Sequence, residues 1–248
     1  MSDRIEIDSD TWVLVLTGAG VSAESGIPTF RASPDGLWEN HKIEDVASPE
    51  GFAADPSLVW RFYSERRAKA KTVDPNPGHH ALRALEEKLG DRFLLATQNV
   101  DGLHGRAGSK RVVEIHGSLF KTRCAFCERD PFDDDVVYAD NEVPGCGSCA
   151  ERGEFGVLRP HIVWFGEMLD PRDLHRISRF MSNAPKLLFI AAGTSGAVYP
   201  AAGFVNNARR FGAHTVLINA DPADNGSQFH RWIQGKSGSV LPELFHVR

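Results

Sequence analysis

The amino-acid sequence predicts an α/β protein in which both ends of the chain build one doubly wound parallel sheet. Short, branched apolar segments alternate with segments of helical periodicity, as is typical of a sheet covered by helices on both faces. A glycine-rich turn follows the first apolar segment, and all four cysteines lie between residues 124 and 149. We therefore expect a smaller module, made of the helical segment Pro49–Lys71 and the cysteine segment, to be inserted into the larger domain.

Five segments are expected to form strands of the main sheet. Each is short, rich in branched or aromatic apolar residues, and bounded by turn-forming residues. They are Trp12–Leu16, Phe93–Ala96, Val112–Ile115, Leu187–Ala192 and Thr215–Ile218.

The helices are expected between these strands. Pro56 is well placed at a first helical position, and Gly90 is a typical helix stop. The segment from Pro28 to Ser48 is predicted to be irregular, and the polar segment Cys124–Cys149 to be loop-like. The expected helices are Pro56–Lys71, His79–Leu89, Asp173–Met181 and Pro200–Phe211.

The composition is that of an ordinary globular protein. The chain has 248 residues, 42% hydrophobic and 25% charged, and a formal net charge of −5. This acidic balance argues against nucleic acid as the main partner. The sequence holds no apolar run of the roughly 18 residues that span a membrane, and its start does not look like a signal peptide. We expect a cytoplasmic protein with no membrane partner.

The glycine-rich turn indicates a phosphate-binding loop. Gly18, Ala19, Gly20 and Ser22 lie in a G-x-G-x-x-A pattern directly after the first expected strand. Such a turn lets backbone N–H groups approach a pyrophosphate, which the N-terminus of a following helix also favours. A simple strand–helix turn is the alternative. The usual ribose carboxylate about 20 residues later is missing.

The four cysteines form two C-x-x-C pairs separated by 18 residues. Pairs at this spacing can place four thiolates tetrahedrally around one Zn²⁺, and four protein ligands leave no position for water. The zinc is therefore expected to be structural. A redox dithiol, the alternative, needs only one pair. The expected ligands are Cys124, Cys127, Cys146 and Cys149.

Polar residues follow the expected strands at the edge where such folds bind ligands. Gln98, Asn99 and Asp101 follow one strand, and His116 follows the next. An imidazole there can act as a general base near neutral pH, although a lone histidine is more often structural. The remaining histidines, such as His79, have no metal-ligand spacing and no role is assigned to them.

Two further turns offer polar groups at the same edge. The first, Gly193-Thr194-Ser195, offers hydroxyls and N–H groups to phosphate or ribose. The second, Asn219-Ala220-Asp221, is a better candidate for the missing ribose carboxylate than Asp35 or Glu39, which lie in a stretch expected to be irregular. An ordinary Asx turn is its alternative.

Taken together, these segments resemble the sirtuin family over nearly the whole chain. No single motif decides the match, but their order and number do. The motifs are Gly18–Arg31, Gln98–Asp101, His116-Gly117, the four cysteines, Val163–Glu167 and Gly193–Ser195.

The resemblance implies a Rossmann-like large part and a small zinc-and-helix part, with NAD and acyl-lysine meeting between them. The large part would comprise residues of about 1–35, 78–118 and 157–248. The small part would comprise a helical stretch of about 36–77 and a zinc-binding stretch of about 119–156.

The resemblance also implies roles for individual residues. NAD would be bound by the glycine-rich turn and by residues of later strand ends, and Val163 and Phe165 would pair with the substrate and wall the acyl-lysine tunnel. Asn99 and Asp101 would act in catalysis beside the base, His116. The implied NAD contacts are Gly18, Ala19, Gly20, Ser22, Phe30, Arg31, Trp38, Gln98, Asn99, Asp101, Gly193, Thr194, Ser195, Asn219, Asp221 and Ser237.

The implied activity is an NAD-dependent removal of acyl groups from protein lysines. NAD would be consumed as a co-substrate, yielding nicotinamide, O-acyl-ADP-ribose and free lysine. A mono-ADP-ribosyltransferase is an alternative that needs no deacylation base. A non-catalytic NAD-sensing or zinc-dependent binding module is another, and the full set of polar residues at the strand ends argues against it.

Tyr63 and Arg66 indicate the acyl group. They stand three residues apart on the expected helix Pro56–Lys71, so both project from one face. An arginine and a phenol suit a substrate carboxylate, and the spacing resembles the sirtuin subgroup that removes succinyl and malonyl groups. A solvated basic helix face and a plain deacetylase are the alternatives.

Overall fold

The computed structural model describes residues 4–29, 37–38 and 41–248. Its centre is a six-stranded sheet, all parallel, in the order β12-β11-β10-β2-β5-β6. The order of the strands reverses between β2 and β10, and ligands bind at such switch points in doubly wound sheets. The strands are β2 (Thr11–Thr17), β5 (Phe93–Thr97), β6 (Val112–Glu114), β10 (Lys186–Ala192), β11 (His214–Asn219) and β12 (Arg231–Gln234).

Helices cover both faces of this sheet, which explains why its central strands are buried along nearly their whole length. On one face, α7 (Pro171–Asn183) and α8 (Phe204–Arg210) pack against alternate strand residues such as Leu14 and Phe189. On the other face, α4 (Pro77–Leu89) and α9 (Ser237–Leu244) pack against the intervening residues, such as Val13. The predicted doubly wound α/β fold is confirmed.

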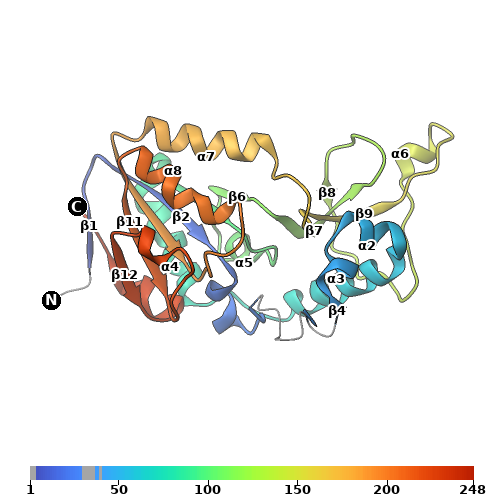
Figure 1. Cartoon of the computed structure of the whole chain (residues 1–248), viewed down its shortest axis with the longest axis horizontal. Coiled ribbons are helices and arrows are strands. Elements are labelled where there is room, and N and C mark those ends of the chain that lie inside the picture. Colours follow the sequence, from blue (N-terminus) through green and yellow to red (C-terminus); the bar gives the residue numbers. More distant parts are fainter. Residues whose placement is uncertain (1–3, 30–36, 39–40) are drawn as a thin grey trace.

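A smaller part adjoins the sheet, and Figure 1 shows the two parts side by side along the long axis of the molecule. It contains the helices α1 (Ile43–Val46), α2 (Pro49–Ala54), α3 (Pro56–Lys71) and α6 (Gly147–Ala150). Its three-stranded antiparallel sheet runs β8-β7-β9, with β7 at Gly117–Cys124, β8 at Phe132–Asp133 and β9 at Leu158–Ile162. One apolar core joins α2, α3, β7, β9 and the cysteines.

The remaining elements are short. The two ends of the chain pair in parallel through β1 (Ile5–Ile7) and β13 (Phe245–Val247), at the far side of the large part in Figure 1. The pair β3 (Leu37–Trp38) and β4 (His41–Lys42) is antiparallel, and α5 covers Leu103–Arg106. Short 3₁₀ turns lie at Ala19–Val21, Ala23–Ser25, Gly90–Arg92, Ala201–Gly203 and Gly226–Gln228.

Several sequence-based expectations were wrong in detail. The cysteine segment is not simply loop-like, because β8 and α6 lie within it and β7 ends at Cys124. The segment between Pro28 and Ser48 contains β3, β4 and α1. The helix expected at Pro200–Phe211 is a 3₁₀ turn followed by α8. Among the helices of the described residues, none has the length and apolar character needed to cross a membrane.

Candidate functional site

The carboxyl ends of β2 and β10 meet at the switch point through two main-chain hydrogen bonds donated by glycines. The N–H of Gly18 donates to the carbonyl of Ala192 at 3.0 Å, and that of Gly20 donates to the carbonyl of Gly193 at 2.8 Å. A Cβ on Gly18 would lie 2.7 Å from the Gly193 oxygen, and one on Gly20 would lie 2.8 Å from the Gly193 Cα. Gly193 itself has φ +60° and leaves no room for a side chain against Val21. Only glycines allow the two turns to pack this closely.

The expectation that a helix follows the glycine-rich turn was wrong. Two 3₁₀ turns, Ala19–Val21 and Ala23–Ser25, follow it instead. Their single-turn length gives little aligned dipole, so this edge does not offer the helix N-terminus of a standard dinucleotide fold. Phe30 and Arg31 lie outside the described residues, and of Trp38 the backbone strand β3 alone is described.

A buried polar cluster lies behind the turn. The hydroxyl of Ser22 accepts from the Asn99 amide at 3.1 Å, hydrogen bonds with Asp101, and lies 3.4 Å from Nε2 of His79. The backbone N–H of Asn76 donates to Nδ1 of His79 at 3.2 Å, so the proton of this ring is on Nε2 and points to Ser22. Burial raises the pKa of Asp101 and lowers that of His79 to about 4. His79, to which the sequence assigned no role, is thus part of the site.

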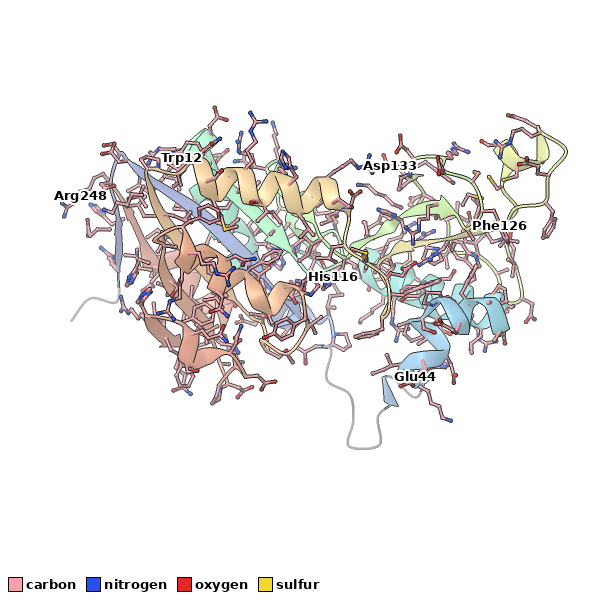
Figure 2. All side chains as sticks on the ribbon, turned by 45° about the horizontal axis from the view of Figure 1, so that its top comes forward. Trp12, Glu44, His116, Phe126, Asp133 and Arg248 are labelled. Atoms are coloured by element: carbon pink, nitrogen blue, oxygen red, sulfur yellow. The ribbon has the colours of Figure 1, made fainter. Side chains whose placement is uncertain are left out.

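His116 lies between the two parts of the molecule, as Figure 2 shows. Its Nδ1 is 3.2 Å from the carbonyl oxygen of Gln98, which can only accept, so Nδ1 carries the proton. Nε2 is then the nitrogen with a lone pair. Burial lowers the pKa of His116 below its ordinary value of 6.5, although the bond to Gln98 opposes this. The ring is therefore neutral near pH 7 and able to accept a proton.

Gln98 and Asn219 reach the second turn from opposite sides. The Gln98 amide donates to Oγ1 of Thr194 at 3.1 Å, and the Asn219 amide donates to the Thr194 carbonyl at 3.1 Å. Thr194 is buried, whereas Ser195 is exposed. The same Asn219 amide also donates to the carbonyl of Asp221, an exposed residue, at 2.9 Å. The predicted turns are therefore brought together at one edge of the sheet.

Ser237 is buried at the first position of α9. The next residue, Gly238, donates its N–H to the carboxylate of Glu24 at 2.7 Å. This bond fastens the start of α9 to the second 3₁₀ turn after the glycine-rich loop, so Ser237 is held beside that loop.

The segment after β9 runs from the histidine to the helices of the small part. The N–H of Val163 donates to the His116 carbonyl at 2.9 Å, and the N–H of Phe165 donates to the carbonyl of Ala47 at 3.0 Å. The N–H of Trp164 donates to the carboxylate of Glu167 at 2.9 Å. These three N–H groups are bonded internally, and the Trp164 carbonyl accepts from the N–H of Glu167 at 3.0 Å. The Val163 carbonyl is therefore the group of this segment that is available to pair with an added strand.

Tyr63 and Arg66 lie on α3 as predicted, with different surroundings. Tyr63 is buried, and its oxygen accepts from the indole Nε1 of Trp164 at 3.0 Å. Arg66 is half-buried; its guanidinium lies 3.1 Å from the centre of the Phe62 ring and donates to the Phe62 carbonyl at 2.9 Å. The positive charge of Arg66 acts on the phenol, so the two groups are close enough to interact. Trp164 is a residue of this site that the sequence interpretation did not single out.

The four cysteine sulfurs form a compact group in which all lie within 4.8 Å of one another. Sγ of Cys124 is 3.7 Å from that of Cys149, and Sγ of Cys127 is 3.9 Å from that of Cys146. A tetrahedral Zn²⁺ with Zn–S bonds of about 2.3 Å requires sulfur separations of about 3.8 Å. Gly156 closes over the group, since a Cβ there would lie 2.5 Å from Sγ of Cys149. These residues fit a structural zinc ion.

The switch-point topology, the glycine-lined strand ends and the four-thiolate centre define the class: a dinucleotide-binding α/β protein with a structural zinc site. Residues 18–200 match the model of the Sir2 family. The NAD-dependent protein deacylase of Salmonella typhimurium is 50% identical over 247 residues, which is 98% of this chain and 86% of the relative. The deacylase of Escherichia coli K12 is 50% identical over 235 residues, or 94% of this chain and 80% of the relative.

Solved structures agree with this similarity. The complex of a Sir2 homologue with NAD superimposes with a TM-score of 0.83 at 42% identity, covering 93% of this chain and 86% of that one. A structure of a sirtuin described for its substrate affinity gives a TM-score of 0.76 at 31% identity, covering 93% and 90%. The chain belongs to the Sir2 family, as the sequence motifs predicted. Its activity is that of an NAD-dependent protein deacylase, and the predicted structural zinc fits its four cysteines.

Proposed function

We propose that the protein removes succinyl and malonyl as well as acetyl groups from lysines of other proteins, consuming one NAD per turnover. The products are nicotinamide, O-acyl-ADP-ribose and free lysine. The observation that carries the chemistry is the state of His116: its proton is fixed on Nδ1 by the Gln98 carbonyl, and burial keeps the ring neutral.

In the proposed reaction, the amide oxygen of acyl-lysine attacks C1′ of the nicotinamide ribose as nicotinamide leaves. Nε2 of His116 then takes a proton from the ribose diol, and the 2′-hydroxyl attacks the acyl carbon. Water completes the release of lysine and O-acyl-ADP-ribose. Asn99 and Asp101, both bonded to Ser22, hold the nicotinamide ribose and the nicotinamide in this arrangement.

NAD is proposed to lie along the switch point of the sheet. The strongest support is the close packing of the two glycine turns at the strand ends, the place where a pyrophosphate binds in such folds. The adenosine end reaches toward α9. The residues proposed for NAD are Gly18, Ala19, Gly20, Ser22, Phe30, Arg31, Trp38, Gln98, Asn99, Asp101, Gly193, Thr194, Ser195, Asn219, Asp221 and Ser237.

The acyl-lysine is proposed to approach from the small part. The Val163 carbonyl accepts no hydrogen bond from the rest of the described chain, so it can take one from the substrate main chain or amide. The half-exposed Phe165 walls the lysine stem. Tyr63 and Arg66, on α3, then meet the far end of the acyl group. A guanidinium and a phenol are complementary to the terminal carboxylate of succinyl and malonyl groups.

The two parts are proposed to divide this work. Residues of about 1–35, 78–118 and 157–248 bind NAD, and residues of about 36–77 and 119–156 form the helical and zinc-binding part that supplies the acyl pocket. The zinc holds the small part together and takes no part in the reaction, because four cysteines leave no open position on the metal.

The proposal is tested with peptides of one sequence that carry acetyl, succinyl or malonyl groups on the same lysine, mixed with NAD. We expect nicotinamide release from all three, with the highest kcat/KM for the succinyl or malonyl peptide. Mass spectrometry should find O-acyl-ADP-ribose and free lysine. An ADP-ribosylated peptide as the main product would favour a mono-ADP-ribosyltransferase, and a higher kcat/KM for acetyl-lysine would overturn the acyl preference.

A further inference from the structure

The indole of Trp164 and the phenol of Tyr63 form a hydrogen bond deep in the proposed acyl pocket. Nε1 of Trp164 donates to the Tyr63 oxygen at 3.0 Å, and both side chains are 3% exposed. An indole nitrogen can only donate, so the Tyr63 oxygen is the acceptor. Because the Tyr63 oxygen accepts in this bond, the phenol O–H remains available to donate to another group.

That hydrogen has no acceptor within the described residues. Among these residues, the Tyr63 hydroxyl makes one hydrogen bond, which it accepts from the indole of Trp164. Burial raises the pKa of Tyr63 well above its ordinary value of 10, so the group stays protonated at any working pH. A buried donor without an acceptor is unfavourable unless a ligand satisfies it.

Contacts on several sides fix the orientation of the Trp164 indole, and therefore the direction of its Nε1–H. The Arg159 guanidinium lies 3.3 Å from the centre of the indole ring. Arg159 forms an ion pair of 2.7 Å with Glu167, whose carboxylate also accepts the backbone N–H of Trp164. The ring of Phe52 packs against the indole with centroids 5.4 Å apart.

We propose that Trp164 is a positioning residue for acyl specificity: its N–H fixes the Tyr63 oxygen so that the phenol O–H donates to the terminal carboxylate of a succinyl or malonyl group. This inference rests on the proposed acyl preference. An acetyl group ends in a methyl and has no oxygen at that position, so the arrangement contributes to binding of the acidic acyl groups alone. Arg66 provides a positive charge for the acyl carboxylate, and the Trp164–Tyr63 hydrogen bond orients the phenol O–H toward that carboxylate.

The test compares four proteins: wild type, Trp164→Phe, Tyr63→Phe and the double variant. Phenylalanine keeps much of the ring packing and removes the N–H or O–H. For a succinyl-lysine peptide we expect Trp164→Phe to raise KM about 5- to 10-fold with kcat nearly unchanged, the scale of one hydrogen bond. KM for the acetyl peptide should change less than about 2-fold. In the Tyr63→Phe background, Trp164→Phe should add less than about 2-fold, because the group that it positions is gone.

Phe52→Leu is the matched control, since it alters the packing of the indole and keeps the Trp164 N–H. It should affect both peptides equally. Equal effects of Trp164→Phe on both peptides, or the same effect with and without Tyr63, would overturn the inference and leave the acyl preference intact. A wild-type enzyme without preference for the succinyl peptide would instead overturn the preference and the inference with it. A preference that survives Arg66→Met would overturn the assignment of the acyl carboxylate to this pocket, and the inference with it.

A second measurement does not require Trp164→Phe to fold. The chain has five tryptophans, so nuclear magnetic resonance of indole N–H groups gives five signals at most. In Tyr63→Phe, one signal should shift upfield by more than the others, because its acceptor is lost. In wild type the same signal should respond to the succinyl peptide more than to the acetyl peptide. No shift in Tyr63→Phe would show that the hydrogen bond is absent in solution and overturn the inference.

Discussion

The N–H of Val163 donates to the carbonyl of His116 at 2.9 Å, which joins the proposed base directly to the segment proposed to carry the substrate. The next residue, Trp164, contacts Tyr63 at the other end of the acyl pocket. Two neighbouring residues therefore connect the proposed reacting end of the acyl-lysine site to its proposed recognition end. In this proposal, a shift of the segment would move both ends together.

Replacing His116 with alanine should lower deacylation by at least about 10²-fold, the usual scale for a general base. NAD binding should remain nearly unchanged, because the ring bonds to the Gln98 carbonyl and not to the Gln98 side chain. Steady-state kinetics and calorimetric titration with NAD measure the two quantities. His175→Ala, at an exposed position of α7, is the control and should behave as wild type. Near-normal turnover of His116→Ala would exclude this residue as the base.

The pH dependence of kcat/KM should carry the signature of the same histidine. Burial lowers the pKa of His116 below 6.5, and the base works only when neutral. Activity should therefore be constant from neutral pH down to about 6.5 and decline only as the pH falls through the lowered pKa. A pH–rate profile on the best acyl peptide measures this. A half-point of the acid limb at or above 6.5 would contradict it.

Removing one zinc ligand should unfold the small part. Cys146→Ala leaves three thiolates and should abolish tight zinc binding, and structural zinc contributes folding free energy directly. Elemental analysis should give one zinc per chain in wild type, and limited proteolysis should cut the variant within the cysteine segment. Ser148→Ala, in the same helical turn, is the control and should retain the metal. Well-folded wild-type protein without zinc, prepared without chelator, would refute the metal site.

Arg66→Met should depress desuccinylation far more than deacetylation. Losing a charged contact to the carboxylate should cost about 2–4 kcal/mol, or roughly 30- to 1,000-fold in kcat/KM. Lys69→Met removes a positive charge from an exposed position of the same helix and serves as the control. If kcat/KM falls equally for both peptides, or if Lys69→Met has the same effect, Arg66 acts only through surface charge.

His79 should make the protein less stable in mild acid. Its pKa is about 4 in the folded protein, because burial disfavours the charged ring, and 6.5 in the unfolded chain. Between these values the unfolded chain binds a proton that the folded protein does not. Stability is thus fully present above pH 6.5 and is lost as the pH falls toward 4, by at most about 1.4 kcal/mol per pH unit.

His79→Gln removes this proton and is expected to flatten the dependence. Urea unfolding at pH 5 and pH 7 should give a smaller difference for the variant than for wild type. Histidines that do not contact His79 contribute equally to both proteins and cancel in the comparison. His104 lies beside His79, with ring centroids 4.7 Å apart, and His79 causes the smaller part of the lowering of its pKa, so that part changes with the substitution and is included in the measured difference. The same slope in both would place the cause elsewhere.

Five of the six strands of the main sheet could be predicted, because they appear in the sequence as short apolar runs. The edge strand β12, Arg231–Gln234, was missed, because two of its four residues are polar and only one of the four is buried. The small antiparallel sheet could not be predicted, because buried polar side chains form part of its interior. Thr122 of β7 is fully buried and bonds to the carboxylate of Asp134, and Arg159 of β9 is buried under Trp164. Such polar residues interrupt the apolar alternation by which a strand is recognised in the sequence, and the contacts that stabilise them form only in the folded protein.

The candidate site likewise has residues that could be recognised from the sequence and residues that could not. The cysteines and the glycine turns were recognised by local spacing, and His116 by its place in the order of the sirtuin motifs. The contact between Trp164 and Tyr63 joins residues 101 positions apart, and no periodicity links them. His79 did leave a local signal, since Asn76 and His79 form a capping box at the start of α4. Recognising that box would have shown that the His79 ring faces back toward the N-terminus of its helix.

The strand order of the main sheet also bears on how the chain is made. β2 lies at its centre, but its neighbour β10 begins only at Lys186, after the entire cysteine segment. During synthesis, one edge of β2 therefore remains unpaired while the cysteine segment is being made. Such an open edge is a template for wrong pairing, and pairing between distant segments slows folding. The growing chain thus passes through a half-built sheet until its last quarter, which holds β10, β11 and β12, has been made.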